Sequence, residues 1–242
     1  MVSSVSQRER STILLASMKG LFMKHAKTLC SAAVFSLAAI GSAAAQTSRV
    51  EVLHEGFEDV GGLSGWTLVN DSVPAGNGWF QGNAGIFPAQ AGPANSYAAA
   101  NFLSAANGSG TIDNWLITPT LSLYGLTDIS FYTRHAADPG FSELLEVRFA
   151  YGDSNNPADF DTLLTTIGNT GGYPTEWALF NTNLALDGPG RFAFRYTGPA
   201  DLSNYVGLDS VSVVTAVPEP ASWMLLAMGL GGLGLARRRL QS

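Results

Sequence analysis

The chain has 242 residues, one cysteine and a formal net charge of −6, and its charges are unevenly distributed. Residues 46–216 hold 17 Asp and Glu against five Arg, with no Lys, so this stretch alone carries −12. A stretch this acidic is not expected to bind nucleic acid, because it lacks the cations that neutralise phosphates. It also has no cysteine, which excludes a disulfide, and its length of about 170 residues suffices for one sizeable core.

Residues 1–45 have the layout of a secretory signal peptide, which predicts a signal helix at the N-terminus. Basic residues precede a mainly apolar stretch at 29–40. Ala43 and Ala45 then form an Ala-x-Ala cleavage site before Gln46. The basic region is long if translation begins at the first methionine, so an internal methionine is an alternative start. The sequence therefore predicts export, with a mature chain that begins at Gln46.

The middle of the chain, residues 46–216, predicts an all-β domain. Apolar and polar residues alternate with a period of two at 129–134, 145–151 and 191–196. Further candidate strands are 50–53, 66–69, 97–101, 115–118, 162–167, 176–181 and 208–214. Segments rich in Gly, Pro and Asn separate them, and Gly188-Pro189-Gly190 is one such predicted turn. About ten short strands without an amphipathic helix predict a two-sheet antiparallel sandwich of jelly-roll type.

A series of short segments in this middle region carries a family resemblance. The segments are Glu55-Gly56-Phe57-Glu58, Gly65-Trp66, residues 113–119, 129–132, 145–148 and 192–196, and Gly207-Leu208-Asp209-Ser210-Val211. Their order and spacing resemble the choice-of-anchor J domain, which is related to the cleaved adhesin modules of secreted proteases and more distantly to MAM-like sandwiches. The resemblance implies a β-sandwich with a role in adhesion or surface display, and often a structural calcium ion.

Glu58 and Asp209 are the candidate ligands for such a calcium ion. Asp209 has the same parity as Val211 on the last predicted strand, so it points into the core unless a bulge intervenes. A buried carboxylate needs hydrogen bonds, a cation or a proton. Two carboxylates from neighbouring first and last strands, with backbone carbonyls, would suit Ca²⁺, and the resemblance places acidic ligands at both positions. Alternatively, Asp209 accepts backbone hydrogen bonds in a turn and Glu58 is solvated.

Signals for catalysis are weak. His54 and His135 lie in no metal-ligand spacing. The chain has no Gly-x-Ser-x-Gly elbow, and its one cysteine, Cys30, lies within the predicted signal peptide. Tryptophans that could stack on sugars are Trp66, Trp79, Trp115 and Trp177. Aromatic residues at strand positions more often belong to a core than to a sugar-binding surface. Because the signals for catalysis are weak, the sequence predicts a protein that is not an enzyme.

The last 26 residues, 217–242, carry the most specific motif. Val217-Pro218-Glu219-Pro220 leads into a run of 16 uncharged residues at 221–236, which Arg237-Arg238-Arg239 closes. A helix of this length spans about 24 Å, somewhat short of the roughly 30 Å hydrocarbon core. The arginines favour the cytoplasmic side of a membrane, which places the rest of the chain outside.

This order of Pro-Glu-Pro, apolar helix and arginine cluster resembles the PEP-CTERM sorting signal of Gram-negative bacteria. The resemblance implies transient anchoring in the inner membrane and removal of the tail by exosortase, a transpeptidase-like membrane protease. The alternative is an ordinary C-terminal membrane anchor.

Three classes of function remain open from the sequence. The first, which we favour, is a non-enzymatic protein of the cell surface or extracellular matrix, with adhesion as its role. The second is a module that binds the cell's own exopolysaccharide, which requires two or more Trp or Tyr side chains exposed on one face. The third is a hydrolase, which requires a cleft with a pair of carboxylates whose pKa values are perturbed.

Overall fold

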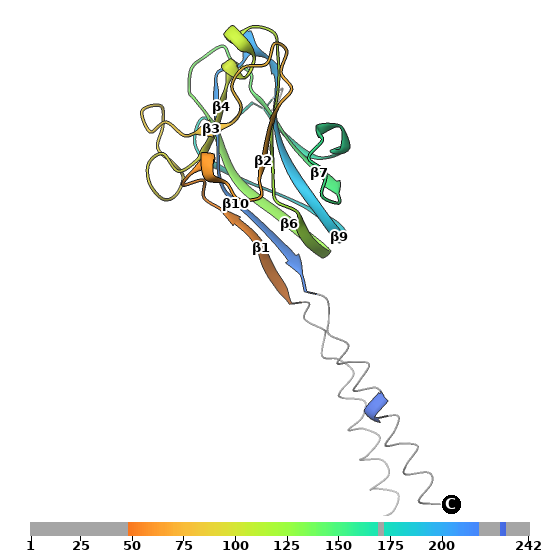
Figure 1. Ribbon diagram of the computed structural model, residues 1–242. Helices are drawn as coiled ribbons and strands as arrows, with labels where there is room; N and C mark the ends of the chain where they lie inside the picture. The colour runs from red at the N-terminus through yellow and green to blue at the C-terminus, as the bar shows by residue number, and fades with distance from the viewer. Residues whose placement is uncertain (1–47, 169–171, 218–227, 231–242) are drawn as a thin grey trace, which may run out of the picture. The chain divides into compact units, whose positions relative to one another are not determined.

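The computed structural model describes residues 48–168, 172–217 and 228–230, and most of them form antiparallel β-structure (Figure 1). The strands are β1 (Arg49–Glu55), β2 (Thr67–Asn70), β3 (Phe80–Gln81), β4 (Ala98–Asn101), β5 (Thr111–Ile117), β6 (Leu121–His135), β7 (Leu144–Tyr151), β8 (Thr162–Gly168), β9 (Ala178–Pro199) and β10 (Tyr205–Ala216). Short 3₁₀ turns are η1 (Val60–Gly62), η2 (Phe102–Ser104), η3 (Ala106–Gly108), η4 (Pro157–Asp159) and η6 (Ala200–Leu202). The all-β prediction is confirmed for this part of the chain.

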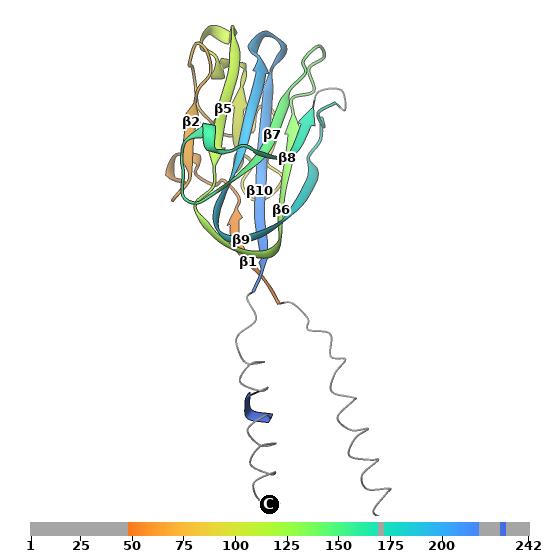
Figure 2. The same ribbon diagram turned by 90° about the vertical axis from the view of Figure 1, so that its right-hand side faces the viewer.

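The ten strands belong to a single hydrogen-bonded sheet that curls over itself. Its main path runs β2-β5-β9-β6-β10-β4-β3, while β1 pairs with β10 and β7 pairs with both β8 and β9. The first half of β9 pairs with β6, and its second half lies between β5 and β7. Figure 2 looks onto the half that contains β2, β5, β7, β8 and the end of β9. The strands are therefore not divided into the two separate sheets that the sequence predicted.

The reason is the length of β9, which has 22 residues. The predicted turn at Gly188-Pro189-Gly190 lies inside this strand and stays paired with residues 121–123 of β6. At Gly190 a side chain would come within 2.4 Å of the Phe149 ring, so only glycine fits where β9 passes from one half of the sheet to the other. Glycine and proline here bend a strand rather than end it.

The core lies between the two halves of the curled sheet. It is formed by alternate residues of the long strands, which the period-two pattern identified: Leu145, Val147 and Phe149 on β7, Phe192, Phe194 and Tyr196 on β9, Ile129 and Phe131 on β6, and Val211 and Val213 on β10. The buried residues of this cluster all lie between Phe57 and Val213. At about 25 cal/mol for each Å² of apolar surface removed from water, this burial is the main source of stability.

Two smaller aromatic clusters cover the outer faces of the sheet. One, under the loop 82–97, contains Phe87, Tyr97 and Tyr205, with Trp177 packed against it. The other, under the loop 152–161, contains Trp115 and Phe160. Both loops are thus attached to the domain by buried aromatic rings rather than by secondary structure. Each of them also covers carboxylates of the sheet.

Candidate functional site

The chain enters and leaves the sheet at one end of the domain. Arg49, at the start of β1, pairs with Ala216, at the end of β10, and the Val217 N–H donates to the Ser48 carbonyl at 2.7 Å. The predicted cleavage residues Ala43, Ala45 and Gln46 lie outside the described residues, as do Pro218, Glu219, Pro220, Arg237, Arg238 and Arg239. Val217 is therefore the one residue of the predicted sorting motif that the structure describes, and it directly follows the last residue of β10.

The predicted helices at the two ends fall almost wholly outside the described residues. Of the predicted membrane-spanning run 221–236, only Met228–Leu230 is described, and it is helical and exposed. Among residues 48–168, 172–217 and 228–230, no helix combines the length and apolar character that crossing a membrane needs. The signal helix and the transmembrane helix stay predictions.

Asp209 is buried, but it does not face the core beside Val211 as its parity predicted. The register between β10 and β6 shifts between Asp209 and Ser212, and Ser210 has a φ of 51°. Because of this bulge, the side chains before and after it no longer alternate regularly between the two faces of the sheet. Gly207, two residues before Asp209, abuts Phe87, Tyr97 and Trp177 of the outer cluster. Asp209 is therefore buried on the outer face, under the loop 82–97.

The Asp209 carboxylate is surrounded by hydrogen-bond donors. Its Oδ2 accepts from the backbone N–H groups of Gln90, at 2.8 Å, and Ala91, at 3.2 Å. The Ser210 hydroxyl lies 3.2 Å from Oδ1 and 3.0 Å from the Gln90 side-chain oxygen. Burial raises the pKa of Asp209 above its ordinary value, and these hydrogen bonds only partly oppose that effect. From the sequence, hydrogen bonds from backbone N–H groups are the alternative to a metal ion at Asp209. These bonds are present, but a loop 119 residues earlier in the chain supplies them rather than a local turn.

Glu58 lies at the surface just beyond β1. It follows Phe57, which is fully buried and has a φ of 55°, and its carboxylate lies close to Gly56. Within the described part of the chain, no three His, Cys, Asp or Glu side chains are grouped closely enough to hold a metal ion. A shared calcium ion at Glu58 and Asp209 stays a prediction.

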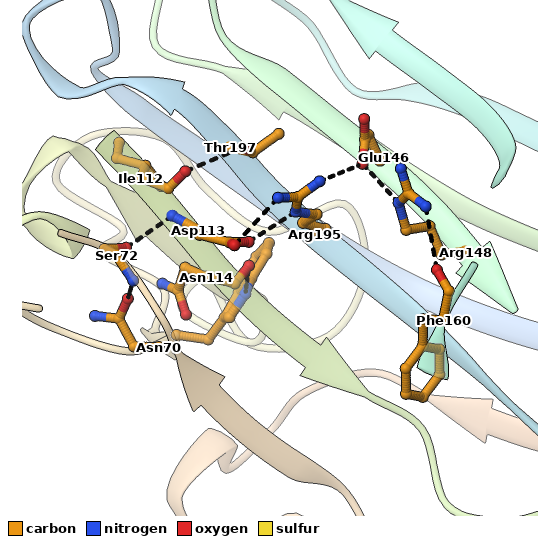
Figure 3. A network of polar contacts seen from close by, with 11 residues as sticks. Asn70, Ser72, Ile112, Asp113, Asn114, Glu146, Arg148, Phe160, Arg195 and Thr197 are labelled. Atoms are coloured by element: carbon orange, nitrogen blue, oxygen red, sulfur yellow. Dashed lines mark hydrogen bonds and ion pairs between the residues drawn. The ribbon is translucent and has the colours of Figure 1, made fainter. Parts of the chain in front are cut away.

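A second group of charged residues lies on the outer face of β5, β9 and β7 (Figure 3). Arg195 Nε donates to Asp113 at 2.7 Å, and Arg195 Nη1 donates to Glu146 at 3.2 Å. Arg148 Nε approaches the same Glu146 oxygen at 2.7 Å. The Arg195 guanidinium also lies over the Trp115 ring, 4.9 Å from its centroid, so it combines an ion-pair network with a cation–π contact.

The charges of this network neutralise one another. Burial by itself would raise the pKa of Glu146, but the hydrogen bonds and charges of Arg148 and Arg195 outweigh it and lower the pKa below its ordinary value. Arg195 has a raised pKa, chiefly because it donates hydrogen bonds to Asp113. Glu146 is thus kept ionised, and both carboxylates are paired with arginine, as in a structural ion-pair network.

The two histidines of the described residues do not form a catalytic group with other side chains. His54 is exposed beside Glu51 at 3.3 Å. His135 Nδ1 lies 2.9 Å from Oε2 of Glu143, which is fully buried. The other Glu143 oxygen accepts from the Asn204 N–H, so this pair fastens the β6–β7 loop to β10.

The hydrolase alternative also requires a cleft with a pair of carboxylates. A cavity of about 450 Å³ between β8 and β9 is lined by Thr166, Ile167, Gly168, Gly172, Tyr173, Pro174 and Phe180. None of these lining residues is a carboxylate or a histidine, so the cavity does not supply the acid and base that the alternative needs.

The four tryptophans do not form an exposed surface for stacking on sugars. Trp66, Trp79 and Trp115 are buried. Trp177 is half-buried, and its indole N–H donates to the Pro88 carbonyl at 2.8 Å. Three of the four thus belong to the buried clusters, and Trp177 packs against one of them.

Several residues around Asp209 and Arg195 were not predicted from the sequence. Glu146 and Arg195 alternate with core residues on their strands, so their outward direction was available from the pattern, but the pairing of β7 with β9 was not. Gln90 and Ala91 act through their backbone N–H groups, and no side-chain pattern indicates such a role.

Comparison with known families finds one match in this chain: residues 216–239 match the PEP-CTERM protein-sorting motif. The match begins at the last residue of β10 and includes the predicted Pro-Glu-Pro and arginine residues. It indicates export and sorting to the cell surface, and it implies processing by exosortase. None of the curated proteins matches the chain.

Among solved structures, the chain is similar to adhesin domains. The K3 cleaved adhesin domain of Lys-gingipain from Porphyromonas gingivalis is 25% identical, with a TM-score of 0.52 over 69% of this chain and 99% of that domain. The K1 domain of the same protein is 26% identical, with a TM-score of 0.52 over 69% of this chain and 97% of that domain. The domain described above is thus similar in fold and in sequence to these cleaved adhesin domains.

Proposed function

We propose that this chain is an exported, non-enzymatic protein of the cell surface or extracellular matrix of a Gram-negative bacterium, and that its β-domain acts in adhesion. The observation that carries the proposal is the direct continuation of β10 into the sorting motif: the motif begins at residue 216, where β10 ends beside the start of β1. A domain whose two ends lie together is held at that end and presents its opposite loops to the surroundings.

The similarity to cleaved adhesin domains supports this proposal. We further propose that the domain is of the choice-of-anchor J type, that it is a variant of the jelly-roll sandwich, and that Glu58 and Asp209 share a structural Ca²⁺. The raised pKa of Asp209 and the lack of an arginine among its hydrogen-bond partners support the calcium site, because a buried carboxylate without a counter-ion is relieved by a cation.

The sorting proposal holds that a signal peptidase removes residues 1–45 and that an exosortase removes the tail while the helix at 221–236 anchors the chain in the inner membrane. Mass spectrometry of the exported protein tests it. We expect the mature chain to begin at Gln46 and to end near Pro218–Pro220. Recovery of an intact 237–239 peptide in the dominant surface form would contradict the processing step and would support an ordinary membrane anchor.

A module that binds the cell's own exopolysaccharide is the second candidate function. Export to the surface would bring the domain into contact with such a polymer, and the acidic domain could reach acidic sugars through bridging cations. Glycan-array binding of the exported, processed protein, with and without calcium, separates the two candidates. Selective binding to one polysaccharide class would favour the module, whereas adhesion to cells without glycan binding would favour the adhesin.

A further inference from the structure

The first half of β9 forms an open edge of the sheet. From Ala178 to Leu186 the strand pairs with β6 on one side. Its pairings with β5 and β7 begin only at Gly190 or later, so within the described ranges no strand pairs with its other side. Such an edge presents a row of backbone N–H and C=O groups that can pair with another strand.

This edge lacks the features by which the edge strands β1, β3 and β8 avoid pairing, and it is longer than the four-residue edge strand β2. The edge strand β1 carries Arg49, Glu51, His54 and Glu55, and β3 has only two residues. The edge strand β8 is interrupted by a shift of register opposite Val147 and Arg148. By contrast, residues 178–186 contain no charge and no proline, and their register with β6 is continuous. Charge, shortness and bulges are the usual protection of an edge.

The side chains along this edge are incompletely covered. Phe180 and Leu184 face the core and pack against it, but each is only half-buried. Phe180 stacks on Phe131 with ring centroids 5.9 Å apart and also lines the cavity beside β8. Leu179, on the outer side, is 54% exposed. A strand added to this edge would cover both the open backbone groups and this apolar row.

The order of residues along the edge indicates what that strand is. Ala178-Leu179-Phe180-Asn181-Thr182-Asn183-Leu184-Ala185-Leu186 has the same classes of residue when read in either direction from Thr182. We propose that this edge pairs antiparallel with the same edge of a second copy of the chain, about a two-fold axis at Thr182. Two-fold pairing of this kind is isologous, so the one surface supplies both sides of the contact.

This pairing brings like residues together across the axis. Phe180 lies opposite Leu184 on the core side, and Asn181 lies opposite Asn183 on the outer side. Thr182 lies opposite its own copy. The first charge beyond the edge, Asp187, falls opposite the uncharged Trp177. The strong net charge of the domain is thus kept away from the contact, and the pairing depends on the folded domain alone, whether or not the sorting proposal holds.

A charge-swap series on the exported, processed protein tests the proposal by light scattering. We expect the wild type to have the mass of a dimer. Asn181→Lys with Asn183→Lys places like charges opposite each other twice and should give a monomer. Asn181→Lys with Asn183→Asp places each lysine opposite an aspartate and should restore the dimer. A monomeric wild type, or a dimer that persists in the double-lysine variant, would overturn the proposal.

Cysteine cross-linking of the exported full chain tests the position of the axis, because the sole cysteine of the sequence lies in the predicted signal peptide. Thr182→Cys places two thiols directly opposite each other, within the Cα separation of about 7 Å that a disulfide allows. The control, Ala178→Cys, lies on the same half-buried row, but its copy is eight residues away along the pair, or about 27 Å. We expect a covalent dimer for Thr182→Cys only. Equal cross-linking of the two variants would exclude this register.

Discussion

The two aromatic patches on the outside of the sheet are built alike but differ in the partners of their carboxylates, which are partly buried in one patch and fully buried in the other. Under the loop 152–161, Asp113 and Glu146 are paired with Arg195, which lies over Trp115. Under the loop 82–97, an arginine again lies over an aromatic ring, Arg134 over Phe87 at 4.4 Å. That arginine donates to the exposed Glu176 and to the Thr175 carbonyl rather than to Asp209, so Asp209 is left with neutral donors.

The difference identifies the carboxylate that has no charged partner. A carboxylate bonded to two arginines gains little from a metal ion, because its charge is already balanced. A buried carboxylate whose hydrogen-bond donors are all neutral has no positive charge to balance its own. The raised pKa of Asp209 reflects the free-energy cost of burying that charge. If this difference matters, the patch over Asp209 should depend on its loop, on a cation and on its charge in ways that the arginine-paired patch does not.

The largest expected effect comes from removing the ring that holds the loop 82–97. Phe87 is buried and contacts Tyr97, Trp177 and Tyr205. Phe87→Ala should lower the free energy of unfolding by about 3–5 kcal/mol, through lost burial and the cavity left behind. Urea denaturation measures it. The exposed Phe141 offers a control, since Phe141→Ala should cost less than about 1 kcal/mol.

Phe160→Ala is the matched change under the other loop, where Phe160 is equally buried. Its cost should be similar, but only Phe87→Ala should release the Gln90 and Ala91 N–H groups from Asp209. Hydrogen exchange at those two amides distinguishes the variants. Equal protection of both amides in Phe87→Ala and wild type would show that the loop is held by something other than its ring.

The next effect is that of calcium. A ligand that binds only the folded state adds about 2.7 kcal/mol at a hundredfold excess over its Kd. For a domain of this size that raises Tm by about 5–11 °C, and EDTA should reverse the gain. Asp209→Asn should lose most of the response, whereas Glu146→Gln should retain it. Identical melting curves in EDTA and in calcium would remove the site and leave hydrogen bonds as the whole account of Asp209.

A smaller effect is expected for the arginine-paired patch. Arg195→Met keeps much of the packing on Trp115 but leaves Asp113 without its partner, and should cost about 1–2 kcal/mol, between the values for exposed and buried pairs. The pKa of Glu146 is lowered in the folded protein. The stability that its ionised form contributes is therefore fully present above the ordinary carboxyl pKa and is lost as the pH falls through the lowered pKa. The difference between variant and wild type should therefore shrink in acid. A difference that is constant with pH would show that packing, not charge, is what Arg195 contributes.

Features that depend on neighbouring residues in the sequence could be predicted, whereas features that depend on contacts between distant segments could not. Period-two alternation is local, and it located β7 and parts of β6 and β9, because these segments bury alternate residues. The two-residue β3 has no room for such a pattern. The turn predicted at Gly188-Pro189-Gly190 was wrong because the same residues also permit a bend within a strand, and only the pairing with residues 121–123 decides between them.

The candidate sites show the same limit. The burial of Asp209 was predicted correctly, but the face of the sheet on which it lies was not. The bulge beside it, where Ser210 has a positive φ, has no signature in the sequence. The sorting motif is linear, and its residues could be identified from their order alone.

The smallest effect isolates the charge of Asp209. Asp209→Asn without calcium keeps the shape: its amide oxygen can accept from Gln90 and Ala91, and its amide nitrogen can donate to the Ser210 hydroxyl. Because burial raises the pKa of Asp209, the folded state binds this proton more tightly than the unfolded state does. The wild type therefore gains stability as the pH falls through the raised pKa, and the gain is complete below the ordinary Asp value. The asparagine variant has no such proton to bind, so acidification should stabilise the wild type relative to the variant. This is the opposite of the change expected for Arg195→Met, where acidification reduces the advantage of the wild type. The free energies of unfolding measured by urea denaturation near neutral pH should differ by less than about 1 kcal/mol. A shift toward the variant in acid would mean that donors of the loop 82–97 stabilise the carboxylate more than burial destabilises it, and the patch would then have no need of a cation.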